Sequence, residues 1–175
     1  MQSFLTVVVY ECLDRKLCVT AILIDLEKAF DTVNHRLLTQ KLYYTGIRGT
    51  PNKLIGNYLN GRMLRVKNGN FFSNFEQINI GIPQGSILGP LLFILYINDV
   101  VNASRSFDYT LYADDTTLLA SHKLSDGLVD SVSSELSKIE DWTAGSRLSL
   151  NKKKTQLIDF SKRPNASSRN ILFGN

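Results

Sequence analysis

Residues 111–119, LYADDTTLL, place two adjacent aspartates between two apolar stretches that each resemble a strand. Like charges repel, and burial beside a hydrophobic core raises the pKa of a carboxyl group, so the apolar surroundings make such a pair unusual. Aspartate is also a favoured turn residue, and an acidic turn on a surface hairpin is common. Taken alone, Asp114 and Asp115 therefore fit a polar hairpin turn better than a site that needs their charge.

The rest of the chain mixes strand patterns with helical ones. Helices are predicted from an N-cap at Asp31-Thr32 to Gly46, from Pro51 to Gly61, over 91–101 as a buried helix, and over 126–142. Strands are predicted at 19–26, in a hairpin over 63–80 around Asn68-Gly69, on both sides of the aspartate pair over 107–120, and at 155–160. This mixture predicts an α+β fold, with an antiparallel or mixed sheet and helices packed on one face.

Three carboxylates come together if the hairpin lies beside the strand that ends at Asp25. The chain has two cysteines and two histidines without zinc spacing, so a metal site would be built from carboxylate oxygens. Magnesium is a hard cation that takes oxygen ligands and offsets their charge. A pair of such ions can stabilise both the attacking and the leaving oxygen of phosphoryl transfer.

Positive charge is unevenly distributed along the chain. Residues 145–175 hold seven lysines and arginines against Asp159 alone, and residues 48–67 hold five basic residues and no acidic one. Such blocks are typical of a protein with an anionic partner such as nucleic acid, but they also fit a merely soluble surface.

The longest apolar run, 87–97, is too short to span a bilayer, and the N-terminus lacks a signal-peptide pattern, so we expect an intracellular protein that is not secreted.

Three motifs occur in a fixed order: DLEKAFDTVNH at 25–35, GIPQGSILGP at 81–90 and YADD at 112–115. Together with GIRG at 46–49, YLNGR at 58–62 and LSLNKKKT at 148–155, they closely resemble the palm of reverse transcriptases of non-LTR (LINE-type) retrotransposons. The resemblance covers residues 19–160 and implies a polymerase palm with a catalytic YADD hairpin. It also implies an RNA-directed DNA polymerase that joins a dNTP to the 3′-hydroxyl of a DNA primer on an RNA template, in a nuclear or cytoplasmic ribonucleoprotein.

The resemblance assigns the catalytic and metal-binding roles residue by residue. Asp25 and Asp114 match the two direct metal ligands, and Asp115 matches the supporting aspartate of the pair. Two Mg²⁺ ions are the implied cofactors, with Mn²⁺ as a substitute. Lys154 matches a lysine near the leaving pyrophosphate, a candidate general acid, although the register among Lys152, Lys153 and Lys154 stays open.

Substrate contacts are implied for a second group of residues. Phe30 matches an aromatic steric gate, whose ring leaves no room for a 2′-hydroxyl and so favours dNTPs. Gln84 and Gly85 match the motif that lies against nucleotide and template, and Tyr112 matches a residue near the primer terminus. The basic residues expected to bind nucleic acid are Arg48, Arg62, Arg65 and Lys67.

Two alternatives are weighed. RNA-copying RNA polymerases also carry a second aspartate at the spacing of Asp25 and Asp31, but Phe30, YADD and PQGSILGP favour reverse transcriptase.

Residues 1–18 are interpreted as a truncated remnant of fingers or of a linking helix, and 161–175 as a basic polar tail. Fingers, thumb and endonuclease regions are expected in a larger polyprotein. The alternative function is therefore an incomplete, catalytically inactive remnant that binds nucleic acid.

Overall fold

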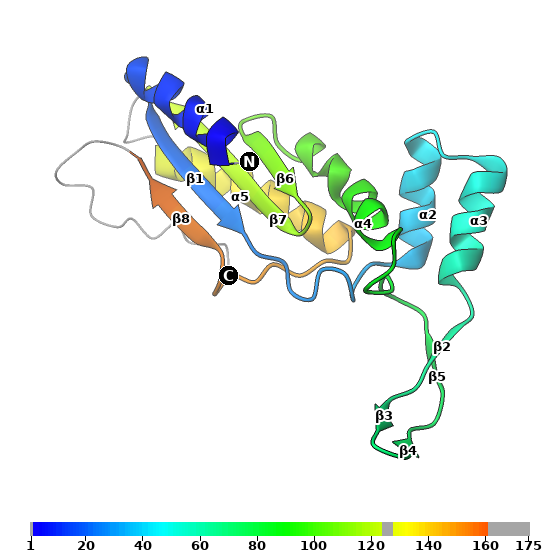
Figure 1. Ribbon diagram of the computed structural model, residues 1–175. Coiled ribbons are helices and arrows are strands. Elements are labelled where there is room, and N and C mark those ends of the chain that lie inside the picture. Colours follow the sequence, from blue (N-terminus) through cyan, green and yellow to red (C-terminus); the bar gives the residue numbers. More distant parts are fainter. Residues whose placement is uncertain (1, 124–127, 161–175) are drawn as a thin grey trace.

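The computed structural model describes residues 2–123 and 128–160, so the predicted tail at 161–175 lies outside the described residues. The helices are α1 (Gln2–Asp14), α2 (His35–Tyr44), α3 (Gly49–Leu59), α4 (Gly89–Ile97), η1 (Asn98–Asn102, a 3-10 helix) and α5 (Leu128–Gly145). The strands are β1 (Cys18–Ile24), β2 (Arg62–Leu64), β3 (Lys67–Asn68), β4 (Phe71–Phe72), β5 (Glu76–Ile78), β6 (Asp108–Tyr112), β7 (Asp115–His122) and β8 (Gln156–Asp159). Figure 1 shows their arrangement.

The main sheet has the strand order β6-β7-β1-β8, and every neighbouring pair is antiparallel. The predicted α+β class is confirmed. Of the two predicted sheet types, antiparallel or mixed, the main sheet is antiparallel. β1 lies between β7 and β8, and six of its seven residues are buried. A strand covered on both faces reads as a continuous apolar run, which is why VTAILI carries no alternation.

Helices cover both faces of this sheet. On one face, Ile22 and Leu118 pack with Leu136 of α5 in a buried cluster. On the other face, Ala21 and Leu119 pack with Val9 of α1. The prediction of helices on one face alone is wrong, because the sheet has buried apolar residues on both faces, Ile22 and Leu118 on one and Ala21 and Leu119 on the other, and both sides need cover.

A second core joins α2, α3 and α4 beside the sheet. Leu38 and Leu42 of α2, Leu59 of α3, and Leu92 and Phe93 of α4 are essentially without solvent exposure. The buried residues of α4 lie on one side only, since Leu91 is 52% and Ile94 42% exposed. The prediction of a helix buried all round is therefore wrong for α4.

Two predicted local signals are displaced. The N-cap of α2 is Asn34, whose Oδ1 accepts a hydrogen bond from Leu37 N at 3.0 Å, and not Asp31-Thr32. A bridge between Asn34 and Ile80 keeps the chain extended up to this point, so the helix starts later. In the hairpin, Asn68 pairs with Phe71, so the turn residues are Gly69 and Asn70 instead of Asn68-Gly69.

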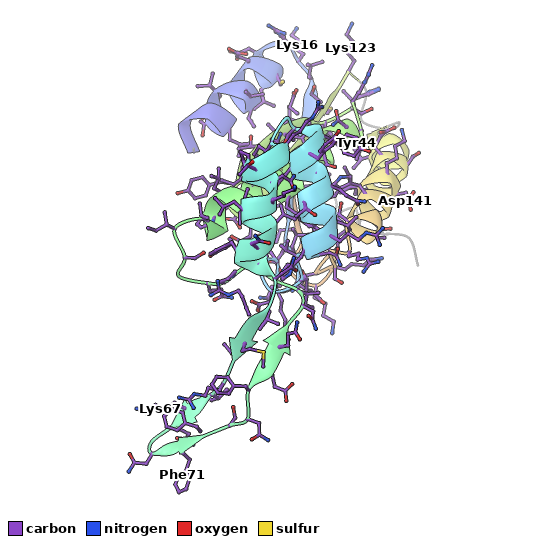
Figure 2. The ribbon with its side chains drawn as sticks, turned by 90° about the vertical axis from the view of Figure 1, so that its right-hand side faces the viewer. Lys16, Tyr44, Lys67, Phe71, Lys123 and Asp141 are labelled. Atoms are coloured by element: carbon purple, nitrogen blue, oxygen red, sulfur yellow. The ribbon has the colours of Figure 1, made fainter. Side chains whose placement is uncertain are left out.

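Residues 61–80 form a hairpin that projects from the body, and we call it the arm (Figure 1). It contains two short ribbons, β2 with β5 and β3 with β4. Phe71 is 83% and Phe75 57% exposed, so the arm carries large apolar side chains without a core of its own. Its tip, marked by Lys67 and Phe71, lies far from the sheet (Figure 2). None of the helices within the described ranges is long and apolar enough to cross a membrane.

Candidate active site

The ends of β1 and β7 bring the aspartates to one edge of the sheet. Ile24 of β1 pairs with Thr116 of β7, and this is the last pair between the two strands. Asp25 directly follows Ile24 and Asp115 directly precedes Thr116, so the two aspartates lie just beyond the same pair. Asp25 is half-buried, whereas Asp114 and Asp115 are exposed. The predicted convergence at one sheet edge is therefore present in the strand register, which places Asp25 and Asp115 at neighbouring positions.

The bend of the hairpin consists of Ala113 and Asp114. Tyr112 and Asp115 form the last pair of the ladder, so only these two residues lie between the strands. Ala113 has φ +52°, a left-handed conformation that costs a residue with a Cβ atom about 1–2 kcal/mol. The paired strands on both sides hold this strained bend, and the bend holds Asp114 at its tip.

The segment 148–155 runs along the end of β1 and fixes the backbone of Asp25. Asn151 N donates to Asp25 O at 2.8 Å, and Asp25 N donates to Thr155 Oγ1 at 3.4 Å. Thr155 Oγ1 in turn donates to Asn151 O at 3.0 Å, which closes a small network around the strand end. The predicted role of this motif rested on its lysine, and sequence reasoning missed Asn151 and Thr155. The LN-x-x-KT pattern itself was the signal that could have found them.

Divalent metal ions fit the donor set of this edge. Carboxylate oxygens are the ligands that Mg²⁺ and Mn²⁺ prefer, and those of Asp114 and Asp115 reach solvent. Across residues 2–123 and 128–160, no three acidic, histidine or cysteine side chains lie close enough to form a complete metal cluster. The strand register places Asp25 and Asp115 at neighbouring positions, so this edge offers carboxylate oxygens of the kind that a hard divalent ion takes.

A second loop, GIPQGS at 81–86, is bonded to the chain that follows Asp25. Gly81 N donates to Val33 O at 2.7 Å, and Ile82 N donates to Phe30 O at 2.8 Å. The buried His35 Nε2 lies 2.7 Å from Gly81 O. A Cβ atom on Gly81 would lie 2.8 Å from Asp31 O, so glycine permits this close approach of the two backbones.

The expected substrate residues lie around these two loops. The ring of Phe30 stacks on Phe93 of α4, with centroids 4.5 Å apart and planes at 28°, so the predicted gate ring is held by packing. Gln84 and Gly85 are exposed in the second loop, and Gly85 has φ +77°. Tyr112 is 63% exposed at the end of β6, beside the aspartate bend.

Lys41 of α2 joins α4, η1 and the end of α5, and the sequence carries no signal that identifies it. Its Nζ donates to Asp99 Oδ1 at 2.7 Å, to Tyr96 O at 2.9 Å and to Ser146 Oγ at 3.0 Å. It also lies 4.8 Å from the ring centroids of Tyr96 and Trp142. Burial raises the pKa of the Tyr96 phenol, which donates to Ser146 O at 2.5 Å.

The three lysines of the LNKKKT motif differ in their contacts. Lys152 forms an ion pair with Glu140 of α5, with Nζ 3.0 Å from Oε1. Lys153 and Lys154 are exposed, and Lys154 N is bonded to the carbonyl oxygen of Asn151 at 3.1 Å. The lysine role stays a prediction for Lys154, with the register among the three lysines open.

The four basic residues predicted to bind nucleic acid lie on two different parts of the fold. Arg62, Arg65 and Lys67 belong to the arm, where Arg65 Cζ lies 4.1 Å from the Phe72 centroid. Arg48 precedes α3 and covers Tyr43, and the eleven residues of that helix separate it from the arm by roughly 16 Å. The basic residues of 48–67, which are close together in the sequence, therefore lie at two separate places in the fold.

Comparisons with known proteins agree with the motifs. The family described as reverse transcriptase (RNA-dependent DNA polymerase) matches residues 2–170. Among curated relatives, a probable RNA-directed DNA polymerase from transposon BS of Drosophila melanogaster is 31% identical over 152 residues, 81% of this chain and 16% of that protein. An RNA-directed DNA polymerase from mobile element jockey of the same species is 26% identical over 163 residues, 87% of this chain and 17% of that protein.

Solved structures share the fold. This chain superposes on telomerase from Candida tropicalis, in complex with a fragment of telomeric RNA, with a TM-score of 0.65 at 13% sequence identity. The superposition covers 91% of this chain and 29% of the telomerase chain. Telomerase from Candida albicans gives a TM-score of 0.63 at 15% identity, over 87% of this chain and 30% of its own. The chain spans about a sixth of the length of the curated relatives, 16–17%.

Proposed function

The chain belongs to the reverse transcriptase family, and from this premise we propose that it is the palm of an RNA-directed DNA polymerase of a non-LTR retrotransposon. The observation that carries the proposal is the placement of three separate motifs at one end of one sheet. Asp25 follows the last residue of β1, the bend at Asp114 joins β6 to β7, and backbone hydrogen bonds join the 81–86 loop to the residues that follow Asp25. The proposed reaction is transfer of a nucleotide from a dNTP to the 3′-hydroxyl of a primer.

Asp25, Asp114 and Asp115 are proposed to hold two Mg²⁺ ions, or Mn²⁺ in their place. When bound, these ions supply the charge that activates the primer 3′-hydroxyl and stabilises the leaving pyrophosphate. The protein contributes a half-buried carboxylate whose backbone is fixed by Asn151 and Thr155, and a carboxylate on a strained, strand-held bend. Because the backbone that carries these carboxylates is held in place, only the side chains have to reorganise when the ions arrive, which favours binding.

The residues around the aspartates are proposed to select and orient the substrate. The Phe30 ring, fixed on Phe93, would exclude a 2′-hydroxyl from the sugar position. Gln84 and Gly85 would face the nucleotide and template from an exposed loop, and Tyr112 would face the primer terminus. Lys154 would donate a proton to the leaving pyrophosphate from its exposed turn.

RNA template and DNA primer are the proposed macromolecular partners. The arm carries Arg62, Arg65 and Lys67 against Glu76 alone, a charge balance that suits a phosphate backbone. Because the chain spans 17% of the jockey relative, we propose that fingers, thumb and endonuclease regions belong to the same larger polyprotein. A nuclear or cytoplasmic ribonucleoprotein is the proposed location.

Substitution of Asp114 by asparagine tests this function. Asp114 lies exposed in a two-residue bend, so the change leaves the core intact, and loss of a charged metal ligand should lower primer extension on an RNA template by roughly 10²-fold or more. The matched control is Asp108→Asn, an exposed acid at the start of β6 in the same hairpin. Equal extension by the two variants would remove Asp114 from the mechanism.

The small share of the relatives' length favours a second candidate, an incomplete remnant that binds nucleic acid without catalysis. Extension of a DNA primer on an RNA template by the 175-residue chain, with dNTPs and Mg²⁺, separates the two candidates. Incorporation that requires Asp114 refutes the remnant. Salt-dependent binding of template–primer without incorporation supports it.

A further inference from the structure

Asp31 makes a side-chain contact that the proposed catalytic roles do not use. Its Oδ1 accepts a hydrogen bond from Gln84 Nε2 at 2.9 Å, and the two residues are 53 positions apart in the chain. Asp31 directly follows Phe30, the proposed gate, and Gln84 lies in the loop proposed to face the nucleotide. The contact therefore joins the two substrate loops through side chains.

The backbones of these loops are already fixed before the side chains meet. Val33 O and Phe30 O accept hydrogen bonds from Gly81 N and Ile82 N at 2.7 Å and 2.8 Å. The close approach of Gly81 to Asp31 O leaves no space for a Cβ atom there. Because both backbones are fixed, the hydrogen bond between the side chains costs only the rotamer entropy of Asp31 and Gln84.

The chemistry of the pair fixes the orientation of the Gln84 amide. An ionised carboxylate only accepts hydrogen bonds, so the amide must present its NH₂ group to Asp31. Its carbonyl oxygen, Oε1, then points away from the carboxylate. An asparagine at position 31 would both donate and accept, so the Gln84 amide could turn over and present either end.

We propose that Asp31 is a positioning residue that holds the carboxamide of Gln84 with its carbonyl oxygen toward the incoming nucleotide. This inference rests on the proposed function, since it assigns Gln84 to the nucleotide site. Asp31 and Gln84 are both exposed, so the bond between them adds little to the stability of the fold. Its effect falls on substrate orientation, where a fixed donor or acceptor counts most.

The first test measures the orientation of the Gln84 amide directly in the 175-residue chain. The NMR signals of the two amide protons, assigned by their loss in Gln84→Ala, should be widely separated in the wild type because one proton is bonded to a carboxylate. Asp31→Asn should bring them toward the ordinary spacing of a free glutamine. The matched control is Glu27→Gln, which removes an exposed negative charge four residues upstream and should leave the spacing unchanged.

The second test measures primer extension with each variant. Asp31→Asn should raise KM for the dNTP about 3- to 10-fold, with kcat and the melting temperature nearly unchanged. Gln84→Ala should raise KM similarly, and the double variant should be no worse than Gln84→Ala alone, since Asp31 acts only through the amide. Additive effects of the two substitutions would overturn the inference.

The outcomes separate this inference from the proposed function. If the wild-type chain extends primers and Asp31→Asn has an unchanged KM, the positioning role is wrong and the polymerase assignment stands. If the wild type neither binds dNTP nor extends primers, the proposed function fails and the inference fails with it, even with well-separated amide signals. An Asp31→Asn variant that unfolds at a lower temperature with unchanged amide signals would assign Asp31 a structural role instead.

Discussion

Replacement of Lys41 by methionine should destabilise the fold far more than the same replacement of Lys53, the other lysine of α2 and α3. The Nζ atom donates to Asp99, to Tyr96 O and to Ser146 Oγ, and the side chain is only 16% exposed. Methionine keeps most of the aliphatic volume between the rings of Tyr96 and Trp142, so the change removes charge and donors while it preserves packing.

The expected loss follows from the groups left behind. Tyr96 and Ser146 are buried, and each acceptor without a donor costs about 1–3 kcal/mol. The Asp99 pair adds little, about 0–1 kcal/mol, because Asp99 is 45% exposed and water replaces the ammonium there. Methionine recovers part of the loss through packing on the rings. We therefore expect a decrease of about 2–4 kcal/mol in the free energy of unfolding.

Urea denaturation followed by circular dichroism measures this loss. With a slope of about 2 kcal/mol per molar urea, the midpoint should fall by about 1–2 M. Lys53→Met, at an exposed position of α3, is the matched control and should change the free energy by less than about 0.5 kcal/mol. Two variants with the same midpoint would show that the contacts of Lys41 contribute nothing net, and the reasoning would be refuted.

Three further predictions concern substrate choice, binding and pH. Phe30→Val should raise the ratio of kcat/KM for rNTPs to that for dNTPs by about tenfold or more, and an unchanged ratio removes the gate role. Neutralising the arm with Arg62→Gln, Arg65→Gln and Lys67→Gln should lower the salt slope of template–primer binding by up to about 2, while Lys16→Gln, at the opposite end of the molecule (Figure 2), should not. Bonds from Lys138 and Ser104 lower the pKa of Glu135 below 4.5, so the carboxylate stabilises the fold above pH 4.5 and this contribution is lost as pH falls through the lowered pKa. Glu135→Gln should therefore be less stable than the wild type at pH 7 in thermal melts, with the difference vanishing in acid; a difference that persists there contradicts the linkage.

Local sequence signals were reliable where one kind of interaction dominates. The apolar run at 19–26 predicted β1 and the end of the strand near Asp25, because a short apolar segment rich in β-branched residues is typical of a buried strand. The helical pattern over 126–142 predicted α5, whose Val132, Leu136 and Ile139 are buried against the sheet. The three motifs predicted the family, since their order along the chain does not depend on any contact.

Signals failed where a distant segment competes with a local preference. Asp31-Thr32 is a good N-cap by composition, but the bridge between Asn34 and Ile80 keeps the chain extended beyond Thr32. The helix therefore begins later, with Asn34 as its N-cap. Asn68-Gly69 is a good turn pair, yet the register of the arm places the turn one residue later. In both places the propensities differ by about 1 kcal/mol or less, so a few distant hydrogen bonds decide.

The sequence by itself determined the α+β class and the family, and it named the candidate site residues, because periodicity and motif order are properties of the chain alone. Only the tertiary structure decided which of them meet. The register of Ile24 with Thr116 places Asp25 beside the aspartate hairpin, and the loop at 81–86 brings Gln84 to Asp31. It also separated Arg48 from the arm and paired Lys152 with Glu140. The physical reason is that contacts between residues far apart in the chain depend on strand register and packing, which no local pattern encodes.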